Sequence, residues 1–296
     1  MNEKKLTIKD SSISFIVSFW LCQVGVIAAT CLTYIFFKIF NINTSNFLIF
    51  FNTAIGYLIS SLALDLVLVL IFIFYKKGKT NKITSKLSLK KVLIYTLVAI
   101  CSFLCLYPLI VCIDSLLIKC GIELSTLPYE LTTKNYFISL ISLVLAPAIC
   151  EELLFRGIIF SGLKSHGKTF SISITAIMFS LFHMSISQTV YPLLMGLLLS
   201  VIMYYENNIY YCILVHGINN FLSLTLSYFK INLIFNHWTY ILLAIALAIM
   251  FITTLIYFTI KNNKTEKKLP IDKSDKTYLL ASLAIMLVLW LILNLG

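Results

Sequence analysis

Charged residues are scarce in this chain, and arginine is almost absent. Of the 296 residues, 12% are charged and 60% are hydrophobic, and 22 of the 23 basic residues are lysines. Soluble domains use about 45–50% apolar and about 25% charged residues, so this composition excludes a soluble globular protein. The single arginine, Arg156, closes the run Glu151-Glu152-Leu153-Leu154-Phe155-Arg156. Adjacent carboxylates beside a membrane-length apolar segment are costly, and such groups usually serve a function.

Two sequence patterns typical of metal and redox sites are also missing. The eight cysteines contain no CxxC pair, and the chain has no HExxH run. Most of the cysteines lie in apolar segments, where a free cysteine behaves as a small hydrophobic residue. We therefore expect neither a disulfide framework nor a thiolate zinc site. Cys150 is a poor candidate nucleophile, because the carboxylates that follow it disfavour the reactive thiolate.

Long hydrophobic runs dominate the chain, and its mean hydropathy is +0.96. A membrane-spanning helix needs about 20 mainly apolar residues. Nine segments approach this length: 13–37, 47–75, 92–118, 136–155, 169–183, 190–205, 209–229, 238–260 and 277–295. The fifth and sixth are short, so we predict an all-α, polytopic transmembrane helix bundle with eight to nine spans. The first run is too long for a cleavable signal peptide, and we expect it to be a span.

The net charge of +11 follows from how the lysines are distributed between the two sides of the membrane. With a cytoplasmic N-terminus and nine spans, 19 basic residues fall in cytoplasmic segments and 4 in outer segments. This asymmetry is the positive-inside pattern. It predicts a multi-pass protein with a cytoplasmic N-terminus whose basic segments contact anionic lipid, and it gives no reason to expect a nucleic-acid partner. The Lys-, Ile- and Asn-rich composition is typical of an AT-rich genome, so we expect a bacterial cytoplasmic membrane.

Two lysine-rich linkers, 76–91 and 261–276, help to divide the chain. We expect leading transmembrane helices over 1–135, a functional core over 136–230 and C-terminal transmembrane helices over 231–296. Polar residues concentrate in the core, whereas Asp65 and Asp114 stand alone in the leading spans. We interpret these two aspartates as structural hydrogen-bonding groups, with a proton path as the alternative.

Three short motifs in the core place polar side chains at helical spacing. They are Glu151-Glu152-x-x-x-Arg156, Phe179-x-x-x-His183 and His216-x-x-x-Asn220. Residues four apart share a helix face, so Glu152 and Arg156 are expected to pair and to leave Glu151 free for chemistry.

Two turns are expected in the core, one at Gly167 and one near Asn207-Asn208, and the first brings two of these motifs to one level. Glu151 lies 16 residues before Gly167, and His183 lies 16 residues after it. In an antiparallel helix pair that turns at Gly167, both residues lie about 24 Å from the turn. Pro147 precedes Glu151 by four residues and predicts an irregular helix beside it.

In this order on successive apolar helices, EExxxR, FxxxH and HxxxN resemble the CPBP family of intramembrane proteases. That family unites CAAX-processing endopeptidases with bacterial Abi-type and bacteriocin-processing relatives. The resemblance covers about residues 137–225, roughly a third of the chain, with no departure at the motif positions. It implies one catalytic site containing Glu151, Glu152, Arg156, His183, His216 and Asn220.

The resemblance also implies a role for each pair. Glu151 with His183 would activate the attacking water, and His216 with Asn220 would stabilise the oxyanion. Glu152 with Arg156 would support the site. The family has been described both as metal-dependent and as glutamate-dependent. We predict the metal-free mechanism and keep zinc as the alternative, with Glu151, His183 and His216 as its ligands.

The resemblance predicts an endopeptidase whose substrate is a membrane-associated peptide or protein, such as a bacteriocin or signalling-peptide precursor. Two other functions stay open. A non-catalytic immunity or scaffold protein would keep its function without Glu151. A secondary transporter would use Asp65, Asp114 and Glu151 for proton coupling, although many transporters show internal repeats and this chain has none that we recognise. His166 and His237 are expected to be solvated.

Overall fold

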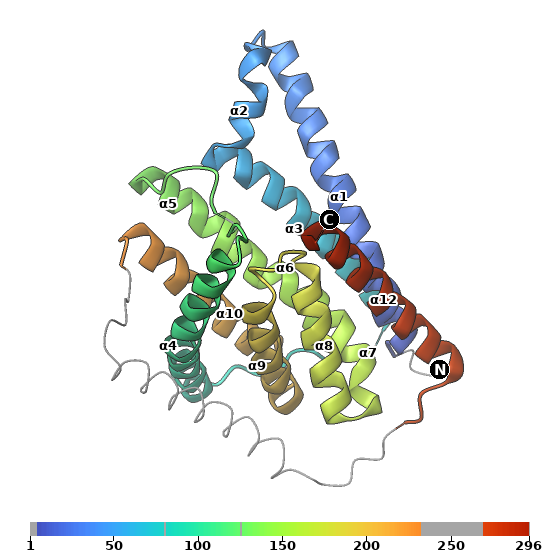
Figure 1. Ribbon diagram of the computed structural model, residues 1–296. Helices are drawn as coiled ribbons and strands as arrows, with labels where there is room; N and C mark the ends of the chain where they lie inside the picture. Colours follow the sequence, from blue (N-terminus) through green and yellow to red (C-terminus); the bar gives the residue numbers. More distant parts are fainter. Residues whose placement is uncertain (1–4, 80, 125, 232–268, 296) are drawn as a thin grey trace.

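The computed structural model describes residues 5–79, 81–124, 126–231 and 269–295, and in these ranges every regular element is helical (Figure 1). Six helices are long and apolar enough to cross a membrane: α1 (Ile8–Ile39), α3 (Ala54–Lys76), α4 (Leu89–Lys119), the continuous helix Thr133–His166, α10 (Ile209–Tyr228) and α12 (Lys273–Leu295). Two shorter apolar helices, α8 (Lys168–Phe182) and α9 (Val190–Glu206), match the two short predicted spans. The expected span 238–260 and His237 lie outside the described residues. The all-α, multi-pass architecture is therefore confirmed.

The long helix Thr133–His166 is not uniform. It runs through α5 (Thr133–Ser139), the π-helical turn η2 (Leu140–Leu145), α6 (Ala146–Leu154), a second π-helical turn η3 (Phe155–Ile159), α7 (Phe160–Leu163) and the 3-10 turn η4 (Lys164–His166). Pro147 lies in the first turn of α6, directly after η2. Proline has no N–H for the regular helical bond, and a π-helical turn accommodates that loss. The irregular backbone predicted beside Glu151 is present.

Both predicted turns of the core are also present. Gly167, with φ of 117°, separates η4 from α8, and this left-handed backbone conformation favours glycine. Asn207 ends α9 in the left-handed region, and the side chain of Asn208 caps α10 by accepting a hydrogen bond from the backbone N–H of Tyr210. The first turn packs α8 against the end of the helix Thr133–His166, and the second packs α10 against α9.

The polar segments that the lysine count assigned to one side of the membrane lie together at one end of the bundle. The backbone N–H of Leu6 donates to Asn81 in the first lysine-rich linker, and Asn207 donates to the carbonyl oxygen of Lys82. The N–H of Leu269 donates to the carbonyl oxygen of Ser165. The N-terminal segment, the first linker, the described part of the second linker from Leu269 onward and both turns of the core therefore share one end.

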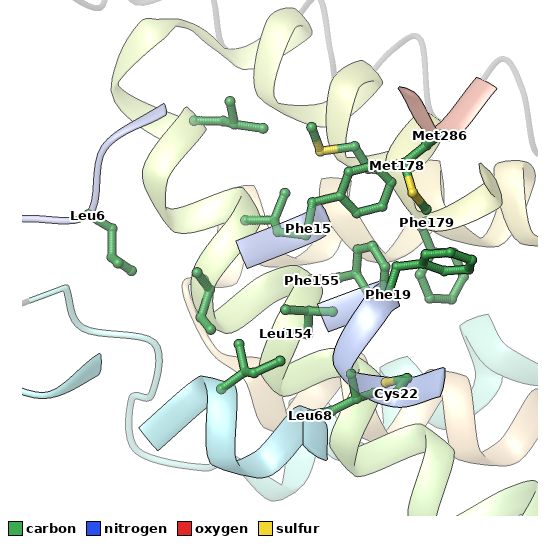
Figure 2. Close-up of a cluster of buried hydrophobic side chains, with 14 of the residues drawn as sticks. Leu6, Phe15, Phe19, Cys22, Leu68, Leu154, Phe155, Met178, Phe179 and Met286 are labelled. Atoms are coloured by element: carbon green, nitrogen blue, oxygen red, sulfur yellow. The ribbon is translucent and has the colours of Figure 1, made fainter. Parts of the chain in front are cut away.

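A large apolar cluster holds the leading and last helices against the core (Figure 2). Phe15 from α1, Phe155 from η3 and Phe179 from α8 belong to it, and Met286 of α12 reaches the same cluster and is fully buried. Elsewhere α1 and α3 expose large apolar side chains, including Leu32 at 66%. Exposed apolar faces on long helices suit contact with lipid rather than water.

Candidate active site

A network of three buried side chains forms the centre of the site. Glu152 and Arg156 are both 0% exposed, and Arg156 Nη1 donates to Glu152 Oε1 over 2.7 Å. The same oxygen accepts a hydrogen bond from His216 Nδ1 at 3.0 Å, which places the proton on that nitrogen. The predicted pairing of Glu152 with Arg156 is therefore present. His216 lies 64 residues after Glu152 in the sequence and joins the pair from α10.

Arg156 makes two further contacts from inside the bundle. Its Nη2 donates to the carbonyl oxygen of Gly196 on α9 over 3.2 Å, and its guanidinium lies 4.8 Å from the centre of the Phe179 ring. Gly196 approaches α8 closely, because a Cβ there would lie 3.0 Å from the Cα of Ala176. The sequence motifs did not single out Gly196. A glycine inside an apolar helix was the available signal, since such positions often mark close helix contact.

Glu151 lies next to Glu152 on α6 but in a different environment. Its side chain is 16% exposed, and its Oε2 atom is buried without a hydrogen-bond partner. The nearest charged partner is His216, whose Nε2 lies 3.9 Å from Glu151 Oε2. This distance permits an ionic interaction but exceeds a hydrogen bond. Glu151 thus makes no described hydrogen bond, whereas Glu152 accepts two at Oε1 and leaves its buried Oε2 without a partner.

His183 follows the last residue of α8 and is held by its own helix. Its Nδ1 is 2.9 Å from the carbonyl oxygen of Phe179, so Nδ1 carries the proton in that bond. In the neutral imidazole, Nε2 is then a free acceptor. The Phe179 ring packs edge-on against both His183 and His216, with centroid distances of 5.1 and 5.9 Å. The Phe179 ring thus contacts both imidazoles and links His183 to His216.

Asn220 lies one turn beyond His216 on α10. Its Nδ2 donates to the carbonyl oxygen of Leu143, which belongs to the π-helical turn η2 ahead of Glu151. The neighbouring Asn219 is fully buried and donates to the carbonyl oxygen of Ala99 and the hydroxyl of Ser102 on α4. Asn220 therefore ties α10 to the helix of Glu151, whereas Asn219 ties α10 to α4.

The structure thus brings the six predicted site residues to the packed region of α6, α8 and α10. Direct contacts join Glu152 with Arg156 and with His216, and Glu151 lies within ionic reach of His216. His183 joins the group through Phe179. Among the described contacts, none links His183 directly to Glu151.

Asp65 is a buried carboxyl group near this region that the motifs do not include. It is 4% exposed on α3, a helix that packs against α6, and it interacts electrostatically with Glu151. Its Oδ2 has no hydrogen-bond partner, so that oxygen does not make the structural hydrogen bond expected from the sequence. Asp114 is only partly buried on α4.

The described residues do not form a preassembled metal site. No three His, Cys, Asp or Glu side chains in the described ranges lie close enough together to hold an ion. His216 Nδ1 already bonds to Glu152, and Glu151, His183 and His216 do not converge on one point as zinc ligands must. All eight cysteines are free. The mechanism proposed for this site therefore uses side chains and water and assigns no step to zinc.

Comparison with known families identifies the region that contains this site. Residues 133–222 match the family model described as type II CAAX prenyl endopeptidase Rce1-like. The match begins with the first residue of α5, ends just after Asn220, and includes all six predicted site residues. It confirms the resemblance to CAAX-processing intramembrane proteases. No curated protein matched the chain. No solved structure matched it either.

Proposed function

We propose, on the premise that residues 133–222 form an Rce1-like domain, that this protein is an intramembrane endopeptidase in which Glu151 and His183 activate water. The observation that carries the proposal is the difference between two adjacent glutamates. Glu152 is 0% exposed and its Oε1 is bonded to Arg156 and His216, whereas Glu151 is 16% exposed and makes no described hydrogen bond. A general base needs this free acceptor within reach of the water it deprotonates.

In the proposed reaction, a water molecule donates a hydrogen bond to the Glu151 carboxylate and attacks the carbonyl carbon of the scissile peptide bond. Its proton passes to Glu151 as the C–O bond forms. The tetrahedral intermediate then collapses, the C–N bond breaks, and the proton is delivered to the leaving amine. His183 supports this path, because its Nε2 is an acceptor while Nδ1–H is held by the Phe179 carbonyl oxygen.

The negative charge on the intermediate would be stabilised from the α10 side. Glu152 holds His216 through Nδ1, which leaves Nε2 directed to the Glu151 side, 3.9 Å from its carboxylate. A protonated Nε2 there can donate to the oxyanion. The Asn220 amide has a second N–H besides the one that donates to Leu143. Preorganised donors of this kind contribute about 10²–10³-fold in rate each.

The substrate proposed is a membrane-associated peptide or protein. The site is built between helices that expose apolar faces, so a substrate segment would reach it along the bilayer. A precursor of a bacteriocin or signalling peptide suits a bacterial membrane, and a prenylated CAAX peptide is the substrate class named by the matching family. Both classes present a lipid-anchored or apolar peptide.

The test is a mass-spectrometric comparison of small peptides in membranes and medium. One culture expresses the native protein and another expresses Glu151→Gln at matched levels. A precursor that accumulates only with the variant supports the proposal and identifies the substrate. Identical peptide profiles, with the phenotype kept by both proteins, would favour a binding or immunity protein instead.

An in vitro assay complements this comparison. An internally quenched, farnesylated peptide that ends in a CAAX sequence reports cleavage directly. Purified native protein should release fluorescence and Glu151→Gln should not, with Glu123→Gln as the control because Glu123 is an exposed glutamate outside the site.

A further inference from the structure

The segment that follows His183 has an unusual backbone for its sequence. It connects α8 to α9 over residues 183–189, and Met184 adopts φ of 49° in the left-handed region. Residues other than glycine and asparagine rarely adopt this conformation, and it persists where surrounding contacts hold it. Because Met184 directly follows His183, whatever fixes its backbone also constrains the end of α8 that carries the imidazole.

Contacts within the segment account for part of this support. The Ser180 hydroxyl donates to the carbonyl oxygen of Thr189, and the Thr189 hydroxyl donates to the carbonyl oxygen of Ser185. These bonds close the loop on itself and on the end of α8. They do not involve the N–H of Ile186 or the carbonyl oxygen of Met184.

Those two backbone groups are bound by a residue from the far end of the chain. Asn294 on α12 accepts a hydrogen bond from the Ile186 N–H at 2.7 Å and donates to the Met184 carbonyl oxygen at 3.3 Å. One carboxamide thus bridges both sides of Ser185 as acceptor and donor together. Backbone groups at membrane depth need such partners, because lipid supplies none.

The helix that carries Asn294 is anchored independently of it. Leu279 and Met286 of α12 are 5% and 0% exposed in the apolar cluster that also contains Phe179, and α12 packs along α1 (Figures 1 and 2). Asn294 also donates to the carbonyl oxygen of Trp290 on its own helix, which fixes its orientation. Changing Asn294 should therefore free the loop without detaching α12.

We propose that Asn294 is a positioning residue for His183, so that the last helix completes a catalytic site whose other parts lie within residues 133–222. The inference rests on the proposed function, because it assigns the loop a role through His183. Asn294 lies 72 residues beyond the end of the matched region, and none of the three motifs includes it.

The test uses the full-length protein in detergent with three variants and one control. Asn294→Ala and Asn294→Leu remove both loop bonds, whereas Asn294→Asp keeps the oxygen that accepts from Ile186. The control is Leu293→Ala, because Leu293 is the neighbouring residue and is 63% exposed. Hydrogen–deuterium exchange over residues 183–189 reports the loop, and the farnesylated quenched peptide reports kcat and KM.

Asn294→Ala and Asn294→Leu should raise amide exchange in the loop by about tenfold or more, because the loop can then open without breaking its hydrogen bonds to residue 294. They should lower kcat roughly 10- to 100-fold with KM changed much less, as expected for a misplaced catalytic group. Asn294→Asp should recover part of both properties, and Leu293→Ala should match the native protein.

Unchanged exchange in the loop would overturn the inference, and so would faster exchange with native kcat. A fall in kcat that only tracks a loss of folded protein would also overturn it. His183→Ala in the same assay separates this failure from failure of the proposed function. A fully active His183→Ala protein refutes the proposed role of His183, whereas an inactive one beside a native-like Asn294→Ala refutes the role of Asn294 alone.

Discussion

Two halves of the candidate site use similar side chains in opposite ways. In the closed half, formed by Glu152, Arg156 and His216, buried side chains bond to one another. In the open half, formed by Glu151, His183 and Asn220, the described hydrogen bonds of His183 and Asn220 go to backbone carbonyl oxygens. Glu151 Oε2 has no hydrogen-bond partner. The closed half is almost fully buried and Glu152 Oε1 joins its three side chains, whereas Glu151 in the open half is 16% exposed and makes no described hydrogen bond.

The difference begins with one step along a helix. Successive residues of an α-helix point about 100° apart, so Glu151 and Glu152 cannot share one environment. Glu152 Oε1 is bonded to Arg156 and to His216 Nδ1 on α10, whereas Glu151 Oε2 lies 3.9 Å from the other imidazole nitrogen of His216. In the proposed mechanism, packing therefore gives two identical residues different roles, support for Glu152 and chemistry for Glu151.

The largest effect should come from breaking the closed half. Arg156→Gln leaves Glu152 as a buried carboxylate without its cation, and loss of one partner of a buried pair typically costs about 3–5 kcal/mol. We expect a large fall in unfolding temperature in detergent together with loss of activity. The control is Lys91→Gln, which removes a pair with Glu206 whose lysine is 49% exposed and should cost at most about 1 kcal/mol. Equal stability of the two variants would contradict the structural role of Arg156.

The open half should respond in activity rather than in stability. His183→Ala removes a side chain whose described hydrogen bond goes to the Phe179 carbonyl oxygen, so the stability loss should be only about 0.5–1.5 kcal/mol. Turnover of the quenched peptide should fall about 10²–10⁴-fold, the usual contribution of a positioned acid or base. His166→Ala, in the turn before α8, should leave turnover native. Comparable turnover in both variants would remove His183 from the mechanism.

A smaller effect should come from the helix contact that supports the closed half. Gly196→Ala puts a Cβ 3.0 Å from the Cα of Ala176, so α8 and α9 must separate while Gly196 still accepts from Arg156. Such overpacking costs about 1–3 kcal/mol. Gly217→Ala is the matched control, since its Cβ would meet the Cβ of Ala148 at an ordinary 3.6 Å. The unfolding temperature of Gly196→Ala should be lower than that of Gly217→Ala. Equal unfolding temperatures would show that the close approach of α8 and α9 is not required.

No effect is expected from removing divalent metals. Because the described residues do not gather three ligands, 1,10-phenanthroline or EDTA should leave turnover of the quenched peptide unchanged. The zinc alternative makes the opposite prediction. Inhibition by phenanthroline that added zinc reverses would establish it and would reassign Glu151, His183 and His216 as ligands.

The sequence predicted the parts of this site that depend on local spacing. The i,i+4 pairing of Glu152 with Arg156, the turns at Gly167 and Asn207, and the irregular backbone after Pro147 all follow from helical geometry and residue chemistry, and all are present. The same reasoning placed Glu151 and His183 at one level, because helix length fixes height along a bundle, but it did not bring His216 to that level.

Long-range contacts could not be predicted in this way. His216 bonds to Glu152 rather than to Glu151 because of the rotation of α10 about its own axis. Apolar periodicity does not fix that rotation, since the lipid-facing and protein-facing sides of such a helix are both apolar. Asp65 and Asn294 approach the core from helices separated from the motifs by long stretches of chain. Single polar residues in apolar spans were the only sequence signal for them.

The most direct test of the account measures turnover and unfolding together for Glu151→Gln. The purified variant, the native protein and the exposed control Glu123→Gln are compared with the quenched farnesylated peptide and by thermal unfolding. The account predicts a loss of at least about 10²-fold in turnover with an unfolding temperature close to native, because Glu151 Oε2 makes no hydrogen bond that the fold would lose. Near-native turnover of Glu151→Gln would contradict the division of roles between the two glutamates.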